Sequence, residues 1–292
     1  MEPFFAGASF IALYGMSYGI VLFTLSVGLV LTLGLMRVVN LAHAAFAAIG
    51  GYVAVGLMNT LGMPFVAAAL ASALLVGLGS LLIERLVYTS LYQASELDQV
   101  LMTIGLMFLA TASLNLVFGP DVVPGRLPAW LMQGLDLGFR KVQTYRVFVI
   151  ALGLVLITLL WLLFERTQFG ARLRAAVDNR SMAEATGIDV RRLYSLAFAL
   201  GSALAAFGGA IGFAMLPLEP LYPFKYLTLM LIVVSLAGMG NLRASAGVAV
   251  LVGLVDTAAR YLLPVAGAFV VYGVFVVLTL WRPDGLFAGR VR

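Results

Sequence analysis

Cysteine is absent from this chain of 292 residues, and histidine occurs only once. The first absence excludes disulfides, thiol catalysis and cysteine-ligated metals, and the single histidine argues against a histidine-based metal site. Charged residues are also scarce, at 11% of the chain, whereas they make up about a quarter of an average soluble domain. We therefore expect no metal and no other cofactor, and the composition excludes a water-soluble fold.

The residues that are present are mainly apolar: 63% of the chain is hydrophobic, and the mean hydropathy is +1.07. A helix needs about 20 apolar residues to cross the hydrocarbon core of a bilayer. Such segments predict a single-domain, all-α, polytopic transmembrane helix bundle of about 8–10 spans over residues 1–292. The expected spans are about 9–36, 40–60, 64–86, 99–118, 147–164, 193–216, 226–240, 244–262 and 266–281. The count depends on whether the region of Asn40 is re-entrant.

The basic residues predict the orientation of the bundle, because cytoplasmic loops carry an excess of Lys and Arg. If the segment 166–192 is cytoplasmic, twelve of the 18 basic residues fall on that side. They are Arg37, Arg85, Arg166, Arg172, Arg174, Arg180, Arg191, Arg192, Arg243, Arg282, Arg290 and Arg292. The other six, on or near the outside, are Arg126, Arg140, Lys141, Arg146, Lys225 and Arg260. This distribution predicts an outer N-terminus and a cytoplasmic C-terminus.

The segment 166–192 is longer than a connection between two spans requires. Ser181 followed by Glu184 has the spacing of a capping box, and Gly187 is suited to end a helix in the left-handed conformation. These signals predict a short cytoplasmic helix of about two turns over residues 181–186. The segment could be a solvated loop on the bilayer surface, or a rigid element that docks a soluble partner.

Five polar residues within the expected spans or at their ends are candidates for the translocation path. Asn40 and His43 could hold a bent entry into the second span or line a translocation path, because polar groups in lipid must be satisfied. Asp256 and Arg260 are four residues apart and can pair on one helix face, and their charges also match the two ends of an amino acid. Thr103, in the fourth span, could bond across helices or line the path.

Several stretches resemble, in the same order, the branched-chain amino acid ABC permeases of the LivH type. Residues 34–43 (GLMRVVNLAH) and 50–52 (GGY) are similar to the family's Gly-x-x-Asn-Phe-Ala-His and Gly-Ala-Tyr elements. Residues 83–88 (IERLVY), 237–242 (AGMGNL) and 283–287 (PDGLF) are similar to its Ile-Glu-Arg-x-x-Tyr, Gly-Gly-x-Gly-Ser and Pro-x-Gly-Leu-Phe elements. The segment 166–192 is similar to the family's coupling loop.

The resemblance implies the membrane-spanning permease subunit of an ATP-driven importer for branched-chain or related amino acids in the bacterial inner membrane. The implied partners are a second, related permease subunit, two ATPase subunits, a periplasmic substrate-binding protein and membrane lipid, with no nucleic acid. Because the chain contains no P-loop sequence, we expect no enzymatic activity in it and ATP hydrolysis on the separate subunits. The residues expected to couple to the ATPase are Arg174, Arg180, Ser181, Glu184, Gly187 and Asp189.

Two other transport functions stay open. The substrate could be urea or a short amide, because selectivity in such importers lies largely in the binding protein. An ion-coupled secondary transporter would usually place acids or broken helices at the midplane of the membrane, and Asp256 alone is a candidate for that role. A membrane-embedded enzyme would need paired carboxylates, metal ligands or a catalytic triad, which the expected spans lack.

Overall fold

The structure, a computed structural model, describes residues 2–36, 39–91, 94–136, 141–238, 240–283 and 285–287. The long helices are α1 (Glu2–Leu35), α2 (His43–Leu61), α3 (Phe65–Ile83), α5 (Glu96–Phe118), α7 (Thr144–Arg166), α10 (Val190–Gly212), α11 (Tyr222–Ala237), α12 (Leu242–Leu262) and α13 (Gly267–Trp281). The shorter elements are the π-helix η1 (Glu84–Tyr88), α4 (Thr89–Leu91), α6 (Ala129–Met132), β1 (Gly134–Asp136), β2 (Lys141–Gln143), α8 (Gln168–Asp178) and α9 (Arg180–Ala185).

Each of the nine expected apolar segments overlaps one of the long helices, which confirms an all-α polytopic bundle. Seven of these helices are long and apolar enough to cross a membrane, so the protein is a multi-pass membrane protein. The helices α11 and α13, of 16 and 15 residues, are apolar but shorter. A helix rises about 1.5 Å per residue, so these two alone would not cover the roughly 30 Å core.

Some residues of the sequence predictions lie outside the described residues. They are Arg37, Arg140, Arg290 and Arg292 of the charge count, and Val38, Met239 and Asp284 of three family-like stretches.

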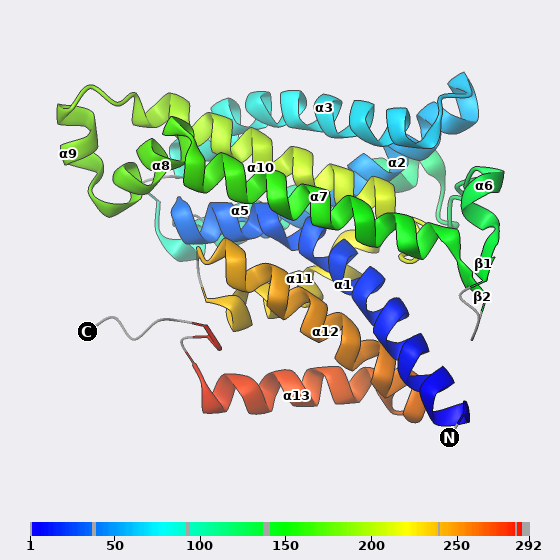
Figure 1. Cartoon of the computed structure of the whole chain (residues 1–292). Helices are drawn as coiled ribbons and strands as arrows, with labels where there is room; N and C mark the ends of the chain where they lie inside the picture. Colours follow the sequence, from blue (N-terminus) through cyan, green and yellow to red (C-terminus); the bar gives the residue numbers. More distant parts are fainter. Residues whose placement is uncertain are drawn as a thin grey trace.

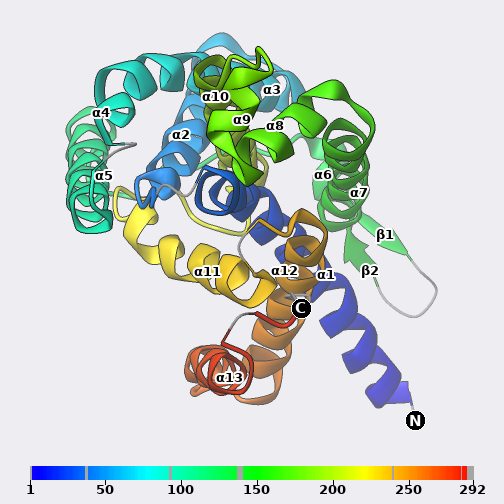
Figure 2. The same cartoon turned by 90° about the vertical axis from the view of Figure 1, so that its left-hand side faces the viewer.

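The helix α1 runs through the middle of the bundle, where it packs against α12, α10, α11 and α7 (Figure 1, Figure 2). In its most apolar stretch 83% of the residues are buried, against 17% in α5 and 22% in α7. A helix that is apolar on all sides and buried within the protein is a central helix, whereas the apolar faces of α5 and α7 are turned outward. The outward faces are therefore suited to contact lipid.

Two glycines of α1 allow neighbouring helices to approach closely. A Cβ atom on Gly19 would lie 2.6 Å from the Cα atom of Val250 in α12. A Cβ atom on Gly28 would lie 2.5 Å from Cε1 of His43 and would also meet the carbonyl oxygen of Gly201 in α10. Small residues permit such backbone contacts between membrane helices, where packing replaces the hydrophobic effect as the attractive force.

The two ends of the bundle differ (Figure 1). At one end, here called the α8–α9 end, these two short helices project beyond the long ones. At the opposite end, here called the hairpin end, lie the N-terminus, α6 and the antiparallel pair β1–β2. This hairpin lies between the fourth and fifth expected spans and was not predicted from the sequence. If the predicted orientation holds, the α8–α9 end faces the cytoplasm.

Candidate functional site

The helix α9 begins at a different cap from the one predicted. Asn179 is extended, with φ −149° and ψ 98°, and its Oδ1 accepts a hydrogen bond from the backbone N of Met182 at 3.0 Å. The predicted capping box is therefore wrong: Ser181 lies inside the helix, and the Glu184 carboxylate instead pairs with Nε of Arg180 at 2.9 Å. Asn and Ser cap helices equally well, and Asn179 comes first along the chain. The four-residue spacing then favours the ion pair with Arg180.

The predicted end of this helix is confirmed at Gly187, which has a φ of +85°. Its backbone N donates to the carbonyl of Glu184 at 3.0 Å, and the N of Ile188 donates to the carbonyl of Ala183 at 3.1 Å. This pair of bonds is typical of a helix that ends in a left-handed residue. The helix itself stops at Ala185, one residue before the predicted end.

The helix α8 precedes α9 and was not predicted. The Thr167 side chain accepts a hydrogen bond from the backbone N of Gly170 at 3.5 Å and caps its start. Leu173 and Ala176 are buried, and the remaining face is largely exposed. The apolar residues Phe169, Leu173 and Ala176 recur at spacings of four and three, a signal that would have predicted an amphipathic helix.

The six residues expected to couple to a partner have two kinds of environment. All six are at exposed positions, and four of them lie on α9 or at its end: Arg180, Ser181, Glu184 and Gly187. The other two join elements together: Nη1 of Arg174 donates to the carbonyl of Phe164 in α7. The carboxylate of Asp189 accepts a hydrogen bond from the backbone N of Arg192 at 2.9 Å and caps α10.

The family-like stretch 237–242 lies against α7 and α8. Arg243 and Glu165 form an ion pair at 3.2 Å between α12 and α7. A cavity of about 410 Å³ is lined by residues of α7 and α8 together with residues 240–243. The backbone N of Leu286 donates to the carbonyl of Leu236 at 2.7 Å, which brings the stretch 283–287 to the same place. Stretches far apart in the sequence thus meet at the α8–α9 end.

Asn40 lies in the connection between α1 and α2, at the same end of the bundle. It is fully buried, and its Oδ1 accepts a hydrogen bond from the Tyr88 hydroxyl at 2.6 Å. In the same π-helical segment, buried Glu84 accepts a hydrogen bond from the Ser195 hydroxyl of α10 at 2.8 Å. π-Helical turns occur frequently at functional sites. The stretch 83–88 therefore links the α1–α2 connection to the start of α10.

His43 and Thr103 are both fully buried. The imidazole Nε2 of His43 lies 3.1 Å from the carbonyl oxygen of Leu25, between α2 and α1. The Thr103 hydroxyl donates to the carbonyl of Gln99, one turn earlier in α5, at 2.7 Å. In this conformation neither residue lines the large cavity described next, and a path-lining role for them stays a prediction.

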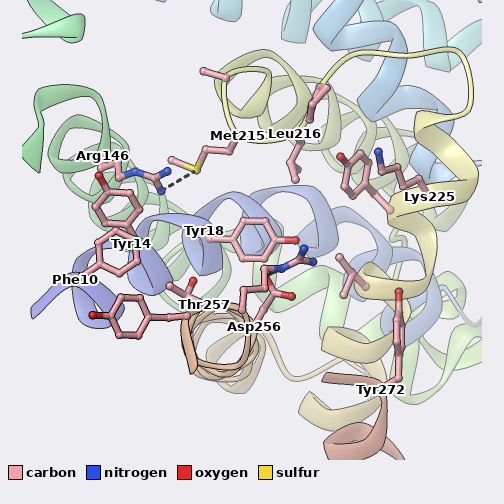
Figure 3. Close-up of a pocket in the computed structure, with 16 residues that line it drawn as sticks. Phe10, Tyr14, Tyr18, Arg146, Met215, Leu216, Lys225, Asp256, Thr257 and Tyr272 are labelled. Carbon is pink, nitrogen blue, oxygen red and sulfur yellow. Dashed lines mark hydrogen bonds and ion pairs between the residues drawn. The ribbon is translucent and has the colours of Figure 1, made fainter. Parts of the chain in front are cut away.

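A cavity of about 710 Å³ lies between α1, α7, α11, α12 and α13, in the half of the bundle nearer the hairpin end (Figure 1, Figure 3). Its lining combines tyrosines, charged residues and apolar residues: Phe10, Tyr14, Tyr18, Arg146, Ala214, Met215, Leu216, Pro217, Lys225, Tyr226, Leu229, Asp256, Thr257, Arg260, Tyr261 and Tyr272. The predicted pairing of Asp256 with Arg260 is present, with Nε and Oδ2 2.8 Å apart. Asp256 is only 5% exposed, whereas the Arg260 side chain is 59% exposed.

Arg146, at the start of α7, is held against α1 and the turn after α10. Its guanidinium carbon lies 3.7 Å from the centre of the Tyr14 ring. Its Nη1 donates to the Ser17 hydroxyl at 3.1 Å and lies 3.9 Å from Sδ of Met215 (Figure 3). From the sequence, Arg146 is predicted only as one of the outer basic residues, and its place in this site was not predicted.

Lys225 was missed in the same way, although it also lines the cavity, and its Nζ pairs with Glu219 at 2.6 Å. One sequence signal could have predicted both residues: basic residues at the outer ends of several expected spans can converge in one cavity at that side of the bundle. The structure brings them together with Asp256 and Arg260. It does not bring Asn40, His43 and Thr103 into that cavity, because neither α2, α5 nor the connection between α1 and α2 lines it.

Comparison with known proteins gives a match to one family over most of the chain. Residues 11–280 match the family described as branched-chain amino acid transport system, permease component. This range includes the α8–α9 segment and all of the cavity lining except Phe10.

Individual relatives are transport permeases of the same kind as the matched family. The chain is 27% identical over 277 residues to the probable branched-chain amino acid transport permease protein LivH of Methanocaldococcus jannaschii, covering 90% of this chain and 85% of that protein. It is 25% identical over 302 residues to the high-affinity permease protein BraD of Pseudomonas aeruginosa, covering 93% of each. It is 22% identical over 211 residues to LivH of Escherichia coli, covering 68% of each. No solved structure matches the chain.

Proposed function

Because this chain belongs to the branched-chain amino acid transport permease family, we propose that it is the membrane-spanning subunit of an ATP-driven importer for branched-chain or related amino acids. In this proposal the whole chain acts as one permease domain in a bacterial inner membrane, with the α8–α9 end in the cytoplasm. A second, related permease, two ATPase subunits and a periplasmic binding protein complete the transporter. ATP is hydrolysed on the ATPase subunits.

The observation that carries the proposal, beside the family, is the projection of two capped helices from an apolar bundle. A soluble ATPase needs a rigid element beyond the lipid surface on which it can act. Arg174 ties α8 to α7, and Asp189 caps α10 directly after the helix α9 has ended. A displacement of α9 would therefore be transmitted to two membrane helices at once.

Within this segment we assign the contact itself to the exposed side chains Arg180, Ser181 and Glu184. Met182 is 62% exposed between them and offers an apolar group to a partner. Gly187, Arg174 and Asp189 position the contact and need not touch the ATPase. This division follows from their hydrogen bonds and from the left-handed conformation of Gly187.

For the translocation path we propose that the 710 Å³ cavity at the hairpin end receives the substrate. Asp256 and Arg260 present one charge of each sign there, which suits a zwitterion better than neutral urea. Asn40, His43 and Thr103 would then belong to the inner part of the path. They are fully buried here, so the path would have to open past them during transport.

The direct test is uptake of radiolabelled leucine by cells that express this chain with its partner subunits. We expect uptake to depend on ATP and to survive collapse of the proton gradient by a protonophore. Cells without this chain, but with all other subunits, are the control. Uptake that stops with the proton gradient while ATP remains high would favour an ion-coupled transporter and contradict the proposal.

A further inference from the structure

Three cationic side chains line the cavity at the hairpin end, and two of them have a carboxylate partner. Lys225 pairs with Glu219 at 2.6 Å, and Arg260 pairs with Asp256 at 2.8 Å. Within the part of the chain that the structure describes, Arg146 makes no ion pair. Its positive charge is therefore not balanced by a neighbouring acid.

Arg146 is nevertheless held in one orientation. Its guanidinium stacks on the Tyr14 ring at 3.7 Å, and Nη1 donates to the Ser17 hydroxyl at 3.1 Å. Its Nε is buried and has no hydrogen-bond partner among the described residues. A guanidinium carries five N–H donors in a fork that fits a carboxylate, and a buried donor without a partner is costly. Arg146 thus lines the cavity as an oriented cation whose N–H donors suit an anion.

We propose that Arg146 binds the carboxylate of the transported amino acid in this cavity. The inference rests on the proposed function, because it takes an amino acid to be the substrate. The ammonium group of the substrate has a partner as well, which is Asp256. Its Oδ2 pairs with Arg260, and its Oδ1 can accept a hydrogen bond from the ammonium group. In Figure 3, Arg146 and Asp256 lie on different sides of Tyr18.

The walls between these charges suit an uncharged side chain. Phe10, Leu216 and Leu229 contribute apolar surface, and the volume of about 710 Å³ is in the range of small-molecule sites. The site would thus select compounds with an α-carboxylate and an apolar end. Neutral urea and amides, which lack a carboxylate, would bind weakly.

Because the chain has no native cysteine, one introduced cysteine can report on occupancy of the cavity. Thr257→Cys places the probe in the lining, and Asn59→Cys is an exposed control outside it. The rate of modification by the neutral reagent methyl methanethiosulfonate is measured in purified protein with increasing leucine. Leucinamide, which lacks the carboxylate, and isovalerate, which lacks the amine, are compared with it.

We expect leucine and isovalerate to slow modification of Thr257→Cys, while leucinamide does not, and none of them to protect Asn59→Cys. Adding Arg146→Gln should raise the leucine concentration needed for half-protection by roughly ten- to hundred-fold, the value of a charge-assisted hydrogen bond. Arg146→Lys should lie between, because it keeps the charge but loses the planar fork. The comparison of ligands on intact Arg146 remains valid if Arg146→Gln does not fold.

Equal protection by leucinamide and leucine, unchanged protection in Arg146→Gln, or no protection by leucine at any concentration would each overturn the inference. Uptake and protection together distinguish a failure of this inference from a failure of the proposed function. ATP-driven leucine uptake without protection refutes the role of Arg146 alone. Protection that depends on Arg146, without ATP-driven uptake, refutes the importer while leaving the binding site.

Discussion

For the pair of Asp256 and Arg260 we predict that the two single changes to Ala lower the stability of the protein by different amounts. Asp256 is buried, with a side chain 8% exposed, while the Arg260 side chain is 59% exposed to the cavity. Arg260→Ala leaves a buried carboxylate without its counter-charge. Asp256→Ala leaves a cation that can still reach water in the cavity. We therefore expect Arg260→Ala to be the more damaging change.

The magnitudes follow from the same exposures. An uncompensated charge in a fully buried pair costs about 3–5 kcal/mol, and the partial access of water to this pair reduces the cost of Arg260→Ala to about 2–3 kcal/mol. The loss of Asp256 should cost about 1 kcal/mol or less, as in exposed pairs. The double change removes both charges and should be more stable than Arg260→Ala alone. With roughly 2 °C for each kcal/mol, Arg260→Ala should lower the melting temperature by about 4–6 °C.

The assay is the fraction of detergent-solubilised protein that stays monodisperse in size-exclusion chromatography after heating. A fixed heating protocol is needed, because membrane proteins commonly unfold irreversibly and the apparent melting temperature then depends on rate. The pair of Arg180 and Glu184 is the matched control. It has the same spacing and a similar distance of 2.9 Å, but both side chains are about half exposed. Its single and double changes to Ala should each alter stability by less than about 1 kcal/mol.

Two results would refute this reasoning. If the costs of Arg260→Ala and Asp256→Ala are equal and add in the double variant, the two charges do not interact in the membrane protein. If the double variant is less stable than Arg260→Ala, the buried carboxylate is not the source of the cost. Normal stability of all three variants with lost uptake would assign the pair to the substrate and not to the fold.

Three further predictions concern the α8–α9 end. Tags inserted near Asn179 and near Gln133 should be labelled from opposite sides of the membrane, the first only from the cytoplasm, and labelling of both from one side would contradict the orientation. Gly187→Val should strain a left-handed residue and lower both leucine uptake and co-purification of the ATPase subunits. The control is Gly62→Val, which changes another left-handed and open position, at the hairpin end, and should leave co-purification unchanged. Glu184→Arg should replace the attraction between Glu184 and Arg180 by a repulsion on the exposed face of α9. We expect it to reduce co-purification of the ATPase subunits while membrane insertion stays normal. Unchanged co-purification and uptake would show that α9 is not the contact.

The sequence alone determined features that depend on composition or on neighbours within about one helical turn. Scarce charge and long apolar segments were enough for an all-α membrane bundle, and each expected segment overlaps a long helix. The pairing of Asp256 with Arg260 follows from their spacing on one helix, and the end of α9 at Gly187 follows from the freedom of glycine at positive φ. Such contacts are formed by the helix itself and do not require knowledge of its neighbours.

The tertiary structure decided what is assembled from separate helices. Ser181 and Asn179 are both good caps, and only the path of the chain shows that Asn179 forms the bond. Arg146 meets Ser17 across 129 residues of sequence, and the Tyr88 hydroxyl meets Asn40 across 48. Between apolar helices in lipid, such contacts depend on which faces pack and how closely their backbones approach. That choice is made by the whole bundle, so the cavity and the position of Arg146 in it could not be derived from any single segment.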